Sequence, residues 1–170
     1  MIACLDVHYK GIFANVACVL FADWADGNII KKFVEQIKGV KAYMPGRFYK
    51  RELPCLLRVL DNISEPMDTI VIDGYVWLDE KKSPGLGAYL YEALDKSIPI
   101  IGVAKSRFKD AEFTQKVFRG RSKRPLYITS VGIDSKIAAD CIRKMHGKHR
   151  IPTLLKGVDQ LCRHYYSEFH

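Results

Sequence analysis

Three strand-like apolar runs in the sequence each finish on one charged residue, and these residues are Asp6, Asp73 and Lys105. Ligands and chemistry in an open sheet gather just beyond the carboxyl ends of parallel strands, so these side chains can meet at one edge of a sheet. A lone carboxylate in apolar surroundings is costly to desolvate and needs a partner such as a metal ion. Two acids and a lysine are therefore the candidate site. The alternative for each charge is a strand that simply ends in solvent.

The hydrophobic pattern predicts an α/β fold that would bring these charges together. Lys10-Gly11 joins two β-rich runs, which is typical of an antiparallel hairpin. Leucines at helical spacing predict a helix that carries Glu52 in its first turn. Two buried-type strands around a further helix indicate a βαβ unit with parallel strands. The expected strands cover residues 2–9, 12–21, 29–37, 68–73, 98–104, 113–118 and 126–131, and the expected helices cover about 50–63, 85–94, 135–145 and 152–166.

Length and composition predict one soluble domain over residues 1–170, because 48% hydrophobic residues suffice for a sizeable core. Five cysteines without close pairing indicate free thiols in a reducing compartment. Met1 leads directly into strand-like sequence, and no run approaches the length of a membrane span, so we expect a cytoplasmic protein without a membrane partner. The formal charge of +8 favours a polyanionic partner but does not by itself identify nucleic acid.

Five short blocks follow one another along the chain in an order and spacing that resemble the endonuclease V family. They are Asp6-Val7-His8-Tyr9, Tyr43-Met44-Pro45-Gly46 with Arg51-Glu52, Ile72-Asp73-Gly74, Gly102-Val103-Ala104-Lys105-Ser106, and Arg150-Ile151-Pro152 with Asp159. The resemblance covers nearly the whole chain. It implies an inosine-directed nuclease with a ribonuclease H-like mixed sheet, in which antiparallel hairpin strands are continued by parallel strands and flanked by helices.

The resemblance also implies roles for five residues. Asp6, Glu52 and Asp73 match the metal-binding carboxylates of the family, and Lys105 matches its active-site lysine. Asp159 lies nine residues after Arg150, at a position that is acidic or histidine in the family. A cluster of hard oxygen ligands independently suits Mg²⁺, with Mn²⁺ as an alternative, and such ions lower the pKa of an attacking water.

Residues that would contact nucleic acid come partly from the resemblance and partly from charge. They are Tyr43, Pro45, Gly46, Gly74, Gly102, Arg119 and Arg121. The first three match a loop that in the family wedges beside the modified base, and the alternative is an ordinary Pro-Gly turn. The glycines at 74 and 102 would let an extruded base approach the backbone, or would only allow tight turns. The two arginines belong to a basic run with interleaved phenylalanines, which is typical of a phosphate-tracking surface and also of a solvated hairpin.

Two departures from the family pattern bear on lesion preference. Asp79 stands where the family tends to have histidine, and it would weaken substrate binding or supply an outer metal contact. The chain starts almost at the strand that holds Asp6, whereas family members usually carry a helical extension before that strand.

From the five blocks and the carboxylate set we expect a Mg²⁺-dependent endonuclease, acting as a monomer near deoxyinosine in DNA or inosine in RNA. The alternatives are a structure-selective nuclease on the same fold and a nucleic-acid-binding homologue with impaired catalysis.

Overall fold

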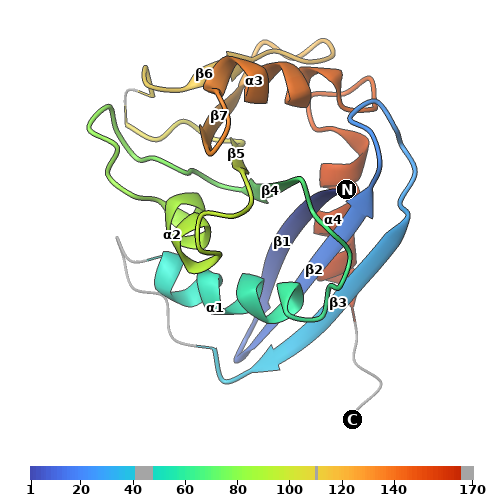
Figure 1. The fold of residues 1–170 in the computed structure, drawn as a ribbon. Helices are drawn as coiled ribbons and strands as arrows, with labels where there is room; N and C mark the ends of the chain where they lie inside the picture. The colour runs from blue at the N-terminus through green and yellow to red at the C-terminus, as the bar shows by residue number, and fades with distance from the viewer. Residues whose placement is uncertain (41–47, 110, 166–170) are drawn as a thin grey trace.

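The computed structural model describes residues 1–40, 48–109 and 111–165 as a mixed α/β fold (Figure 1). The strands are β1 (Ile2–Lys10), β2 (Phe13–Phe21), β3 (Lys31–Lys38), β4 (Thr69–Asp73), β5 (Ile100–Ala104), β6 (Gln115–Val117) and β7 (Leu126–Val131). The helices are α1 (Tyr49–Leu60), α2 (Leu86–Ala93), α3 (Ser135–Lys144) and α4 (Thr153–His164). Every predicted element is present, with ends that differ by a few residues.

The seven strands form one mixed sheet in the order β3-β2-β1-β4-β5-β7-β6. β1 and β2 form the predicted antiparallel hairpin, whose turn contains Gly11 at a φ of +60°, a conformation that favours glycine. β1, β4 and β5 are parallel to one another, and β7 and β6 add an antiparallel pair beyond β5. The predicted mixed sheet, with hairpin strands continued by parallel strands, is therefore confirmed.

Each face of the sheet is covered by two helices. α1 and α2 pack on one face over Leu5, Cys18 and Ile72, whereas α3 and α4 pack on the other over Cys4 and Val71. This division follows from the alternation of side chains along a strand. Within the described residues, no helix is both long enough and apolar enough to cross a membrane.

Strand register decides which face the candidate charges take. Leu5 of β1 lies beside Ile72 of β4, so the residues that follow them, Asp6 and Asp73, emerge at the same level on the opposite face, where α4 packs. Asp73 in turn lies beside Val103 of β5, two residues before Lys105. The three charges therefore meet at the carboxyl edge of the parallel strands, as the sequence predicted.

Candidate active site

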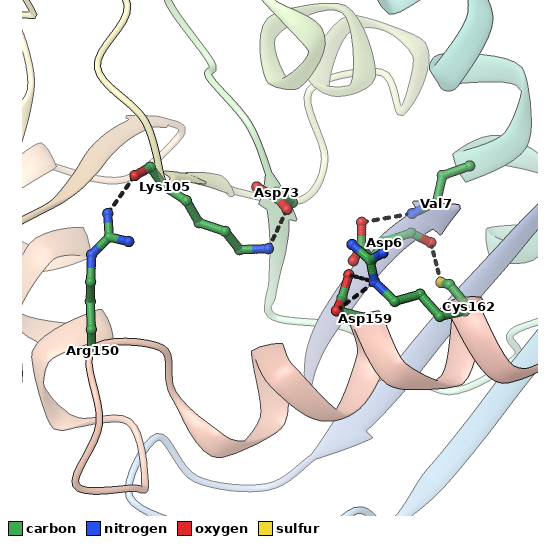
Figure 2. A network of polar contacts seen from close by, with 8 residues as sticks. Asp6, Val7, Asp73, Lys105, Arg150, Asp159 and Cys162 are labelled. Atoms are coloured by element: carbon green, nitrogen blue, oxygen red, sulfur yellow. Dashed lines mark hydrogen bonds and ion pairs between the residues drawn. The ribbon is translucent and has the colours of Figure 1, made fainter. Parts of the chain in front are cut away.

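Lys105 and Asp73 form an ion pair at this edge of the sheet. The Lys105 ammonium lies 2.6 Å from Asp73 Oδ2, and each side chain is 36% exposed (Figure 2). Burial lowers the pKa of Lys105, but the charges of Asp73 and Asp6 outweigh it, so that the pKa is raised overall. Lys105 is thus a fixed cation held among carboxylates.

Asp6 of β1 accepts two hydrogen bonds. Its Oδ1 accepts a hydrogen bond of 2.8 Å from the Val7 amide, and its main-chain carbonyl accepts one of 3.0 Å from the Cys162 thiol of α4 (Figure 2). Burial first, and then the charge of Asp73, raise its pKa to about 7, with a smaller contribution from Asp159. Asp6 is therefore a carboxylate whose negative charge is disfavoured in the protein alone.

Glu52 reaches the site from α1, on the other side of the sheet edge. It is only 5% exposed, and among the described residues its Oε2 has no hydrogen-bond partner. Burial raises its pKa well above the usual range, and the charges of Asp6 and Asp73 raise it further, against an opposing effect of Arg51. An unpartnered buried carboxylate oxygen is costly, which makes it an available ligand atom.

Asp159 projects from α4 toward Asp6, as Figure 2 shows, and both its oxygens accept from Arg163 Nε at 2.9 Å. Its charge raises the pKa of both Asp6 and Lys105. Asp159 therefore belongs to the electrostatic neighbourhood of the site, with Arg163 as its present partner.

The chemistry of this donor set fits a divalent cation. The groups are hard carboxylate oxygens, and Glu52 Oε2 is buried without a partner among the described residues. Neighbouring acids contribute to the raised pKa values of Asp6 and Glu52. In the part of the chain that the structure describes, however, no three acidic, histidine or cysteine side chains lie close enough together to hold an ion as they stand. The ammonium of Lys105 already neutralises part of the cluster through Asp73.

Arg150 anchors the segment that presents Lys105, a role that the sequence analysis did not assign. Its guanidinium donates to the main-chain carbonyl of Lys105 (Figure 2), to that of Pro125 at 2.8 Å and to that of Arg124 at 3.1 Å. Sequence spacing alone gives no sign of these contacts, because their acceptors are backbone atoms far away in the chain.

The structure corrects the expected phosphate-binding role of Arg119. This residue is 7% exposed, and its guanidinium donates to the carbonyls of Met145, Gly147 at 2.9 Å and His149 at 3.1 Å. The side chain is thus occupied in holding the segment between α3 and α4. Arg121, by contrast, is exposed and stays a candidate for phosphate contact.

Arg119→Ala is expected to lower the free energy of unfolding by about 3 kcal/mol, because several buried carbonyls would lose the charged donor that now satisfies them. Arg121→Ala, the matched control two residues away, should change it by less than about 0.5 kcal/mol, as is usual for surface positions. Urea unfolding of both variants measures the difference. Equal stabilities would show that the Arg119 contacts contribute nothing.

Gly102 and Gly74 have different explanations. A Cβ at Gly102 would lie 2.6 Å from the Gly74 carbonyl oxygen and 2.9 Å from Thr129 Oγ1, so close packing excludes any side chain at this position. The expected approach of an extruded base to the Gly102 backbone stays a prediction. Gly74 has a φ of +137° and open space where its Cβ would be. It remains compatible with approach of a ligand.

Two further expectations concern loops. The Asp79 Oδ1 accepts a hydrogen bond of 2.9 Å from the Ser83 amide, and hydrogen bonds from Ser83 lower its pKa, so Asp79 orders its own loop. Tyr43, Pro45 and Gly46 lie outside the described residues. Their expected role as a wedge stays a prediction.

Solved structures of known proteins share the fold of this chain. Endonuclease V of Ciona intestinalis, in complex with a 24mer DNA that contains an inosine followed by a ribo-adenosine, superposes with a TM-score of 0.80 at 16% identity, over 95% of this chain and 84% of that one. The Bacillus subtilis endonuclease V structure gives 0.79 at 17% identity, over 95% and 78%. These are mixed α/β structures of one fold.

Sequence comparison then supplies the family. The endonuclease V family model matches residues 1–160, and the chain belongs to the endonuclease V family. Endonuclease V of Rhodospirillum centenum is 28% identical over 157 residues, which cover 80% of this chain and 64% of that protein. Endonuclease V of Methanothrix thermoacetophila is 34% identical over 106 residues, 62% and 45% of the two chains. The chain thus spans less than two thirds of the length of these relatives.

Proposed function

We propose that residues 1–170 act as one catalytic domain, a divalent-metal-dependent endonuclease that cleaves a phosphodiester near deoxyinosine in DNA or inosine in RNA. The observation that carries the proposal is the meeting of buried Asp6 and Glu52 with the Asp73–Lys105 ion pair at one sheet edge. Family membership and the inosine-containing DNA bound to the Ciona relative support the substrate class. Five free thiols support a reducing compartment such as the cytoplasm, and we propose a monomer there.

Each side chain has a role that its surroundings support. Asp6, Glu52, Asp73 and Asp159 would hold Mg²⁺ or Mn²⁺, which when bound lowers the pKa of a water molecule and neutralises phosphate charge. Lys105 places a fixed positive charge where the scissile phosphate gathers negative charge. Arg150 keeps that lysine in place through its main-chain carbonyl.

A cleavage assay tests this function directly. Matched oligonucleotides with and without inosine, as DNA and as RNA, are incubated with Mg²⁺, Mn²⁺ or EDTA. We expect cleavage of the inosine strands with either metal and none in EDTA. Undiminished cleavage in EDTA would overturn the metal mechanism, and equal cleavage of plain and inosine strands would overturn the base preference.

A second function, a structure-selective nuclease on the same fold, is favoured by Asp79, which stands where the family tends to have histidine and accepts a hydrogen bond from the Ser83 amide of its own loop. Branched and single-stranded substrates without inosine belong in the same assay. Faster cleavage of these than of inosine strands would establish the second function.

Tyr43→Ala should lower the preference for inosine over plain substrate by about 10- to 100-fold, because stacking or wedging is worth roughly 1–3 kcal/mol per base. Cleavage of a flexible single strand should change less, since it needs no wedge. The ratio of kcat/KM for the inosine substrate to kcat/KM for the plain substrate measures the effect. An unchanged ratio would place base discrimination elsewhere in the protein.

A further inference from the structure

A groove of about 470 Å³ lies between β3 and α1, apart from the carboxylate site. One wall is the end of β3 with the residues after it, and the other wall is formed by residues of α1. Its lining residues are Glu35, Gln36, Ile37, Lys38, Gly39, Val40, Lys50, Arg51, Pro54, Cys55 and Arg58. The volume is within the usual range of ligand sites, about 300–1,000 Å³.

Positive charge predominates along this groove. Among the described lining residues, Lys38, Lys50, Arg51 and Arg58 face a single acid, Glu35, whose Oε2 lies 3.4 Å from Arg58 Nε. Lys38 and Lys50 are exposed, and neither has an ion-pair partner among the described residues. Two cations therefore remain available for an anionic ligand.

Arg51 connects the groove with the active site. Its guanidinium lies 3.7 Å from the centre of the Tyr9 ring, and its buried Nε has no hydrogen-bond partner within the described residues. The next residue, Glu52, is the buried acid of the active site, and Tyr9 lies on β1 beyond Asp6. A nucleic-acid strand that runs from the carboxylates past α1 would thus bring its phosphates first to Arg51 and then to Lys38 and Lys50.

We propose that this groove binds the phosphate backbone of the substrate strand on one flank of the scissile bond. The proposal rests on the proposed nuclease function. Phosphate is the chemistry that the groove selects, because Lys38 and Lys50 have no carboxylate partner among the described residues and lie beside the guanidinium of Arg51. The Tyr9 ring holds the Arg51 guanidinium in place by a cation–π contact.

The test combines a double variant with a matched control. Lys38→Gln with Lys50→Gln neutralises the groove, and Lys136→Gln with Lys144→Gln removes the same charge from exposed positions of α3. Binding of single strands is measured by fluorescence anisotropy in the Asp6→Asn background, which prevents cleavage. The strands share one central inosine and are lengthened on either the 5′ or the 3′ side.

Lengthening the strand on one side should raise its affinity for the protein with an unaltered groove but not for the groove variant. In the groove variant, the slope of log K against log salt should also become shallower by about 1.4, at roughly 0.7 for each phosphate contact on a single strand. The control pair should keep both the flank effect and the slope. Equal behaviour of the two pairs would overturn the proposal.

Inorganic phosphate and a mononucleotide separate a free anion from a strand as the ligand. Each is titrated alone while the NMR signals of the groove residues are followed. Saturation by either one at lower concentration than a lengthened strand would overturn the proposal in favour of a small-anion site. Flank-dependent binding in this background, together with no cleavage by the wild-type protein in any metal, would refute the nuclease function alone and leave the groove established.

Discussion

Asp73→Asn is expected to reduce the cleavage rate by more than 100-fold while the affinity for substrate changes little. Even changes in the outer shell of a metal site cost about 10- to 100-fold, so loss of a direct ligand should exceed that range. The substitution also removes the partner of the Lys105 ammonium, which now lies 2.6 Å from Asp73 Oδ2. Lys105 would keep its charge, so the attraction for phosphate remains. Single-turnover cleavage and anisotropy measure the two quantities separately.

Asp140→Asn is the matched control for this prediction. Asp140 is an exposed acid of α3 that pairs with Arg143 on its own helix, and exposed pairs of this kind contribute little. Its cleavage rate should stay within about twofold of the wild type. A similar loss in both variants would mean that the cleavage rate responds to acidic charge in general and not to the site.

The metal-free protein is expected to lose stability as pH rises from about 4 to 7, in part because of Asp6. The pKa of this group is about 7 in the folded protein against an ordinary value of 3.8, so within this window the folded state binds more protons than the unfolded state. Stability then falls as pH rises, and the loss is complete above the folded pKa. At about 1.4 kcal/mol per pKa unit, the full effect is roughly 4 kcal/mol.

Asp6→Asn isolates this contribution. Asparagine cannot ionise and can still accept the Val7 hydrogen bond, so in EDTA the variant should gain stability over the wild type at pH 8 and little at pH 4. Mg²⁺ should stabilise the wild type at pH 8, by about 2.7 kcal/mol at a hundredfold excess over Kd, and the variant much less. Denaturant unfolding at each pH gives these differences. Parallel pH profiles of the two proteins would contradict the role of Asp6.

The sheet and its charged edge could be predicted because both depend on local patterns. Alternating and continuous apolar runs define strands, and the residue that ends each run reports the carboxyl edge, which is why Asp6, Asp73 and Lys105 were found together. Arg119 was misassigned for a physical reason. A buried arginine whose acceptors are main-chain carbonyls looks, in sequence, like any other cation of a basic run.

Gly102 shows a similar limit. Sequence indicates that a small residue is needed there, but only the structure shows that a Cβ would meet the Gly74 carbonyl and Thr129. The groove between β3 and α1 was not foreseen either. Its cations come from β3 and α1, and only the packing of these two elements shows that they line one groove.

Cys162, whose thiol donates a hydrogen bond to the Asp6 carbonyl, can serve as a chemical probe of local opening between α4 and β1. Burial and the charge of Asp6 raise the pKa of this thiol, so the reactive thiolate is scarce at neutral pH. Alkylating reagents can then modify Cys162 only when α4 separates from β1. Its rate of alkylation, read by mass spectrometry of the labelled peptide, measures how often the helix that carries Asp159 opens away from the strand that carries Asp6.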